Sequence, residues 1–384
     1  MKRSELEELL IGKKGDDSKN GIDTGFKDEY GNKIGIDSFA SFLDTEEKFP
    51  TNGEIRSHFK VKEYDPDKKK DKSESDKKEN RLKSSDIKRE LFPREGKSLK
   101  ESFSLSHDFF DDKDFNNDYM FVGLNAAFRS GKESYSNWKN FHDTSLSANT
   151  YKLYIQINAD EEINPKNRFN GCYITDIIKS VIDSNSGHVI RNLFITSNED
   201  ISFFNHPEST PVLDAKRVGK LALFQCQDEK ALVTDMLKKM ADDYKKGERE
   251  YSEGRYQLKE HKKLDDEELK ILSENNRDNL DKSLDIFISE CLAVRPKQLV
   301  VFGGGASTVI DKMIDSQYFK DKLDNIYRTT NLPTDFDVLD LLSHRKCEVT
   351  HYSKRMNFED WFNTKPQELS DELKKLKEKE ELRQ

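Results

Sequence analysis

Three segments of the chain carry polar side chains that could hold a planar, polar ligand. Each segment follows an apolar run typical of a buried strand. Together they supply the amide of Asn125, the carboxyl group of Asp176 and the imidazole of His351. In open α/β sheets, ligands bind outside the carboxyl ends of the strands. An amide, a carboxyl group and an imidazole at converging strand ends therefore indicate a ligand site that offers both donors and acceptors.

Each of these residues also has a purely structural explanation. Asn125 follows a glycine by two positions, where an Asn often bonds its own backbone in a turn. Asp176 could cap a following helix, and His351 could be an ordinary half-buried histidine. The run Gly303–Gly305 is most simply a tight turn from strand to helix. It lacks the Gly-Lys-[Ser/Thr] and G-x-G-x-x-G patterns of nucleotide-binding loops.

The elements that must position these side chains alternate between apolar strands and amphipathic helices. The runs expected as strands are residues 120–122, 172–178, 189–196, 221–224, 298–302 and 347–350. Residues 151–157 fit either a strand or part of a helix. Apolar side chains recur every three or four residues over 232–244 and 280–291, which predicts two helices. This alternation indicates an α/β domain with a mainly parallel central sheet.

Charge divides the chain into regions. We expect residues 1–100 to be a charged N-terminal extension that the rest does not need for folding, with a linker at 65–94 that is almost free of apolar side chains. The α/β domain is expected over 101–365, with a charged helical insertion at about 226–276. Leucines at helical spacing predict a C-terminal amphipathic helix over 366–384.

Composition narrows the function classes. Of the 384 residues, 36% are charged and 34% are apolar, and the net charge is −9. A negative total argues only weakly against nucleic-acid binding, because phosphates respond to a local basic face. The four cysteines stand more than 50 residues apart, so neither a clustered metal site nor a disulfide scaffold is expected. Without a secretory leader or an apolar stretch that could span a membrane, we expect a cytoplasmic protein with no metal, cofactor or membrane partner.

In chain order, the three polar segments resemble the motifs of the uracil-DNA glycosylase superfamily, most closely its single-strand-selective and mismatch-specific branches. The family's Gly-x-Asn-Pro-Gly motif corresponds to Gly123–Ala127, and its strand ending in Thr-Asn, with apolar-apolar-Lys after it, corresponds to Tyr173–Lys179. A helix, a Pro-Lys pair and a strand ending in glycine follow in both. The family's His-Pro-Ser corresponds to His351–Ser353. The resemblance covers residues 105–365 and implies a three-layer α/β/α fold.

The resemblance implies a DNA glycosylase, an enzyme of DNA repair that flips a base out of DNA and hydrolyses its N-glycosidic bond. Asn125 would position the attacking water, and His351 would donate a hydrogen bond to the departing base. Phe128 would stack on the base, and Arg355 would fill the gap left in the DNA. The full set of positions that the resemblance assigns to substrate contact is Gly123, Leu124, Phe128, Asp176, Ser353 and Arg355.

The chain departs from the family pattern in ways that bear on the substrate. Ala126 and Ala127 replace Pro-Gly, and Tyr352 replaces the proline of the last motif. Asp176 stands where the family has the Asn that reads uracil. An Asn offers a donor and an acceptor, whereas an ionised Asp only accepts. Asp176 is therefore expected to favour a base with an exocyclic amine.

Two other functions remain open on the sequence alone. One is a non-catalytic nucleic-acid-binding or nucleotide-binding module on the same fold. The other is an unrelated α/β nucleotide-binding hydrolase that holds phosphate at Gly303–Gly305. DNA is the expected partner, and the insertion or the C-terminal helix could bind a further protein or pack back on the domain.

Overall fold

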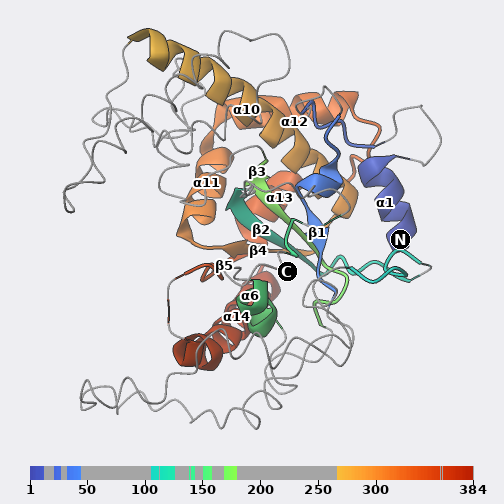
Figure 1. Ribbon diagram of the computed structural model, residues 1–384, viewed down its shortest axis with the longest axis vertical. Coiled ribbons are helices and arrows are strands. Elements are labelled where there is room, and N and C mark those ends of the chain that lie inside the picture. The colour runs from blue at the N-terminus through green and yellow to red at the C-terminus, as the bar shows by residue number, and fades with distance from the viewer. Residues whose placement is uncertain are drawn as a thin grey trace, which may run out of the picture.

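A five-stranded, mostly parallel sheet lies at the centre of the structure (Figure 1). This computed structural model describes residues 1–12, 21–26, 33–44, 105–111, 113–125, 138, 140–142, 150–157, 168–179, 266–354, 356 and 358–383. The strands are β1 (Ser41–Phe42), β2 (Tyr119–Asn125), β3 (Tyr173–Ile178), β4 (Gln298–Phe302) and β5 (Lys346–Val349). Their order is β1-β3-β2-β4-β5, and all are parallel except β1, which pairs antiparallel with β3 at one edge. The expected α/β class and mainly parallel sheet are confirmed.

The strand order places a topological switch point between β2 and β4. The chain passes from β2 to β3 on one side, and then crosses to β4 on the other side of β2. Because β2, β3, β4 and β5 are parallel, their carboxyl ends lie at one edge of the sheet. In open α/β sheets, ligands bind at that edge beside the switch point.

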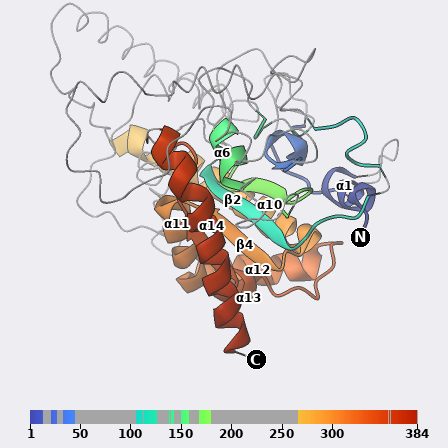
Figure 2. The ribbon, with the colours of Figure 1, turned by 90° about the horizontal axis from the view of Figure 1, so that it is seen from below.

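Helices cover both faces of the sheet (Figures 1 and 2). The helices that share the core of one face are α1 (Arg3–Ile11), α10 (Asp266–Val294), α11 (Gly304–Asp315), α12 (Gln317–Thr329) and α13 (Val338–His344). On the other face, α6 (Thr150–Ile157) and α14 (Phe358–Glu381) pack together and over the sheet. The sheet is therefore buried on both sides, which explains why its strands read as continuous apolar runs.

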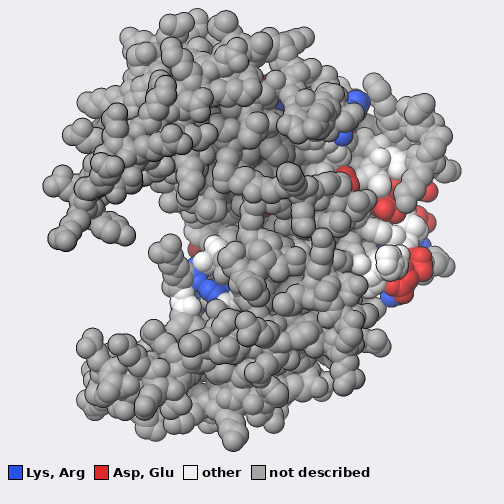
Figure 3. All heavy atoms as spheres, viewed as in Figure 1, with Lys and Arg blue, Asp and Glu red and all other residues white. Residues whose placement is uncertain are grey.

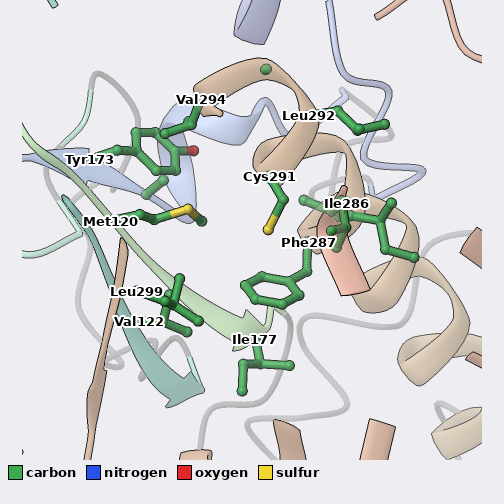
Figure 4. Packing of buried hydrophobic residues seen from close by; sticks show 14 of the residues in the cluster. Met120, Val122, Tyr173, Ile177, Ile286, Phe287, Cys291, Leu292, Val294 and Leu299 are labelled. Atoms are coloured by element: carbon green, nitrogen blue, oxygen red, sulfur yellow. The ribbon is translucent and has the colours of Figure 1, made fainter. Parts of the chain in front are cut away.

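Side chains of the strands alternate between these two cores. Met120 and Val122 of β2 point toward α10, where they meet the core around Phe287 and Cys291 (Figure 4). Phe121, between them in the chain, belongs to the core under α6 and α14. This period of two fixes which positions near the strand ends share a face.

The helices begin and end at residues that the sequence marks. Helix α12 follows Ser316, whose hydroxyl oxygen accepts a hydrogen bond from the Phe319 N–H. Helix α10 ends at Val294, because Arg295 takes a φ of 51° and Pro296 cannot continue the helix. The strand β4 starts two residues later.

Several expected elements take a definite form or new bounds. Residues 150–157 form the helix α6, so the segment 151–157, which fitted either a strand or a helix, is helical. The C-terminal helix starts at Phe358 and not at 366, and residues 266–276 of the expected insertion belong to α10. The parts of these expectations that lie outside the described residues are 65–94, 189–196, 221–224, 232–244 and the insertion before residue 266.

The N-terminal region requires a correction. Leu6 and Leu10 of α1 are fully buried in the core that α10 shares, and Phe42 of β1 is fully buried beside Tyr173 of β3. Residues 3–11 and 36–42 therefore belong to the α/β body and are not an extension preceding residue 101. The apolar side chains of this segment are interspersed with Lys, Asp and Glu, which made the signal too sparse to predict this packing.

Candidate functional site

The carboxyl ends of β2, β3 and β5 bring the three predicted polar positions to one edge of the sheet. Gly123 of β2 is paired with Asp176 of β3, and Asn125 is paired with Ile178. His351 follows the end of β5, whose neighbour is β4. The described structure includes the backbone of Asn125 but not its side chain. Asn125 and Asp176 thus end neighbouring strands, while His351 lies across β4, on the other side of the switch point.

Alternation places these positions on the same face. Phe121, Ile174 and Val349 all belong to the core beneath α6 and α14. Gly123, Asp176 and His351 each follow one of them by two residues. Asp176 and His351 therefore lie on the face that α6 and α14 cover, beyond the last apolar layer.

Asp176 lies directly over Gly123. A Cβ atom at Gly123 would come within 2.1 Å of the Asp176 Oδ1 atom, so only glycine leaves room for the carboxyl group. Asp176 is 5% exposed, and no described residue donates a hydrogen bond to its carboxyl group. It lies inside β3, so the alternative that it caps a helix is wrong.

Burial raises the pKa of Asp176 to about 7; the Lys179 ammonium opposes this rise and the Glu290 carboxylate adds to it. A carboxylate that loses its water without gaining a donor is costly, and protonation relieves that cost. The side chain is therefore poised between two forms near neutral pH. The ionised form offers two acceptors, and the acid form offers one donor and one acceptor.

A buried ion pair fixes the backbone next to Asp176. The Lys179 Nζ atom lies 2.5 Å from Glu290 Oε2, and both side chains are fully buried. Lys179 also donates to the carbonyl oxygen of Asp176 and to the Thr175 hydroxyl oxygen. Glu290 Oε1 accepts from the hydroxyls of Tyr173 and Thr175, each at 2.8 Å. Every donor of the Lys179 ammonium is used, so this lysine holds the end of β3 and is not available to a ligand.

His351 is held as a neutral imidazole. Its Nδ1 atom accepts from the Ser353 backbone N–H at 3.0 Å and lies 2.8 Å from the Ser353 Oγ atom. A backbone N–H can only donate, so Nδ1 carries no proton and the proton is on Nε2. Burial lowers the pKa of His351 to about 4, which keeps the ring neutral at physiological pH. The Nε2–H group has no partner among the described residues and can donate to a ligand.

Aromatic rings and a glycine set the place of the His351 ring. The imidazole stacks on Tyr352 with centroids 4.4 Å apart, and the Phe302 ring meets it edge-on at 6.1 Å. Gly303, at the end of β4, has a φ of 82°, and a Cβ atom there would lie 3.2 Å from the His351 Cβ. Gly303 therefore provides the left-handed turn and the close approach of His351 together.

Helices α6 and α14 clamp the loop that carries His351. Gln156 Nε2 donates to the Thr350 carbonyl oxygen at 3.2 Å, and Lys152 Nζ donates to the Lys354 carbonyl oxygen at 3.1 Å. From α14, Glu368 Oε1 accepts from the Thr350 N–H at 2.8 Å. Polar side chains from two helices thus hold the loop on both sides of the histidine. No local pattern in the sequence marks these contacts, because they join segments far apart in the chain.

The other predicted contact residues have mixed outcomes. Leu124 is buried in the core on the α10 face, so its side chain cannot reach a ligand at this edge. Ser353 is exposed but orients the His351 ring. Phe128 and Arg355 lie outside the described residues. The structure therefore places Gly123, Asp176 and His351 at the same end of the sheet, and it adds Gly303 and Phe302 beside His351.

Among the described residues that the space-filling view shows, Lys or Arg atoms reach the surface next to the position of β5, and Asp and Glu atoms do so on the opposite side of the molecule, near α1 and the N-terminus (Figure 3). In the part of the chain that the structure describes, no group of three or more His, Cys, Asp or Glu side chains could hold a metal ion. Within the same residues, no helix is long and apolar enough to cross a membrane.

Comparison with known proteins adds no family to these observations: no protein family, curated protein or solved structure matches the chain.

Proposed function

We propose that the protein is a DNA glycosylase, which binds an extruded base at the carboxyl ends of β2, β3, β4 and β5 and hydrolyses its N-glycosidic bond. The observation that carries this proposal is the neutral His351, whose Nε2–H group has no partner among the described residues and lies at the same sheet edge as Asn125 and Asp176. The edge flanks the switch point between β2 and β4, where an α/β sheet binds ligands.

The chemistry of glycosidic cleavage matches these groups. As the bond breaks, negative charge develops on the departing base and positive charge develops on the sugar. A donor that is fixed before the reaction stabilises the charge on the base, and removing one such donor typically costs about 10²–10³ in rate. His351 would donate from Nε2 to a base oxygen or nitrogen. Asn125 would orient the attacking water through its amide, and the sugar cation would be quenched by that water.

The surroundings of His351 suit a flat, partly anionic ligand. The half-buried Tyr352 ring lies next to the imidazole, with the buried Phe302 behind both, and aromatic rings of this kind stack on extruded bases. Lys354 is exposed three residues after His351 and could contact a phosphate. A local cation of this kind matters more for DNA binding than the net charge of the whole chain.

An abasic-site assay tests the proposal. The full chain is incubated with oligonucleotides that each carry one normal, deaminated or modified base, and alkali then cleaves any abasic site formed. We expect one class of base to be released, and we expect His351→Gln to slow its release about 10²–10³-fold while leaving DNA affinity within a few-fold. Lys377→Gln, which alters an exposed lysine near the C-terminal end of α14, is the matched control. DNA binding without release of any base would instead favour the non-catalytic module.

A further inference from the structure

The carboxyl group of Asp176 has features that a merely structural residue would not need. It is nearly inaccessible to solvent, it lies over a glycine that leaves room for it, and no described residue donates to it. Its neighbour Lys179 has its ammonium committed to Glu290, Thr175 and a backbone carbonyl. A buried carboxyl group in this situation lacks a donor, and a bound ligand or a proton can supply one.

We propose that Asp176 reads the edge of the bound base in its protonated, carboxylic acid form, and that ionisation of Asp176 releases that base. The acid form presents an O–H donor beside a C=O acceptor, which is the pattern of an Asn or Gln amide. It fits any base edge on which one donor adjoins one acceptor, such as the N3 and exocyclic group of a pyrimidine. This inference rests on the proposed function only in taking the ligand to be a base.

The proposal revises the expectation that Asp176 disfavours a carbonyl edge. An ionised carboxylate would repel the carbonyl oxygen of uracil and the ring nitrogen of cytosine alike, because both are acceptors. The acid form can donate to either one and accept from the neighbouring N–H. Asp176 in its acid form therefore does not discriminate between uracil and cytosine. It instead makes the affinity for the base depend on whether Asp176 is protonated.

The charged groups around Asp176 favour this behaviour. On the neighbouring strand β2 it faces Gly123, which carries no charge, and the charged groups that act on its pKa are Lys179 of its own segment and Glu290 of α10. Glu290 disfavours a second negative charge, and Lys179, which would favour one, is already paired with Glu290. The pKa of Asp176 lies at about 7. One pH unit below that value, the acid form is therefore about ten times more abundant than the ionised form, and one unit above it the acid form is about ten times less abundant.

Binding of deoxycytidine and deoxyuridine to the full chain, measured by calorimetry at about pH 6 and about pH 8, tests this inference. The affinity of the wild type for at least one of the two should fall about tenfold between these values, because only the acid form is competent to bind. Asp176→Asn keeps the shape, the donor and the acceptor but cannot ionise, so it should bind equally at both values and about as well as the wild type does at the lower one. His351 stays neutral across this range and cannot produce the same change.

The outcomes separate this inference from the glycosylase proposal. The inference is overturned by a wild-type affinity that is constant or rises with pH, by the same pH dependence in Asp176→Asn, or by no binding of either nucleoside. The expected binding pattern without release of any base from DNA would leave the inference standing and end the glycosylase proposal. The substitution Asp176→Asn removes a buried charge, so the fold of the variant must be checked. Urea unfolding at about pH 8 provides that check.

Discussion

Two glycines allow polar side chains to lie across the ends of the strands that flank the switch point. Gly123 leaves space for the Asp176 carboxyl group on β2, and Gly303 allows His351 to approach the end of β4. Any side chain at either position would push the polar group away from the sheet edge. The positions of these two glycines are therefore as important to the site as the residues that would contact a ligand.

Replacing Gly123 with alanine should disturb Asp176 specifically. The new Cβ atom would overlap the Asp176 Oδ1 atom, so the buried carboxyl group must move, at a cost of about 1–3 kcal/mol in the free energy of unfolding. Urea unfolding measures this cost. Gly304→Ala is the matched control, because its Cβ would meet only Glu348 Oε1 at 3.4 Å and a helix favours alanine. Equal stability of the two variants would contradict the placement of Asp176.

The pH dependence of stability should report the burial of His351. The folded protein binds a proton there only near pH 4, whereas the unfolded chain binds one near pH 6.5. Between these values the unfolded state binds more protons, so the free energy of unfolding falls as the pH drops from about 6.5 to about 4. The fall should be smaller in His351→Gln, when both proteins are compared by urea unfolding across this range. Parallel pH profiles for the two proteins would mean that the imidazole is not held neutral.

At the scale of elements, the ion pair between β3 and α10 anchors the strand that carries Asp176. Breaking a buried pair by removing one partner typically costs about 3–5 kcal/mol, because the remaining charge is left without a partner. Lys179→Met and Glu290→Gln should each lose about that much in the free energy of unfolding. Lys282→Met, which removes the half-exposed pair with Asp278, should change it by less than about 0.5 kcal/mol. Chemical denaturation of the three variants provides the test. If all three lose the same free energy of unfolding, the buried pair is not an anchor of β3.

The sequence predicted the elements better than the contacts between them. The strands near 120, 173, 298 and 347 were found because strands buried on both faces read as apolar runs. Asp176 and His351 were placed at one edge because parallel strands end together. The Lys179–Glu290 pair spans 111 positions in the chain, and no local pattern marks such a contact. The role of Ser353 was missed for a different reason, since its bond to His351 depends on the shape of one turn.

At the scale of the whole molecule, the N-terminal residues complete the body of the protein. Leu6, Leu10, Phe39 and Phe42 are fully buried, and β1 extends the sheet beside β3. Burying four such side chains contributes about 6–12 kcal/mol. A typical domain is stable by only about 5–15 kcal/mol, so this segment is needed for folding.

Two deletions test that conclusion. A variant without residues 1–44 should fail to fold, as judged by circular dichroism and the loss of a cooperative urea transition. A variant without the linker residues 65–94, a stretch with almost no apolar side chains, should keep the transition of the full chain. If the first variant folds normally, the N-terminal segment is dispensable after all.

We propose that the carboxyl ends of β2 and β4 form the place where a base binds. A crystal structure of the full chain with a single-stranded oligonucleotide is the decisive test, when the target nucleotide carries a 2′-fluoro group that slows cleavage of the glycosidic bond. We expect an extruded base at this place, with its edge atoms in hydrogen-bonding contact with Asp176 and with the Nε2 atom of His351. DNA bound only at another surface, or a base that contacts neither side chain, would contradict it.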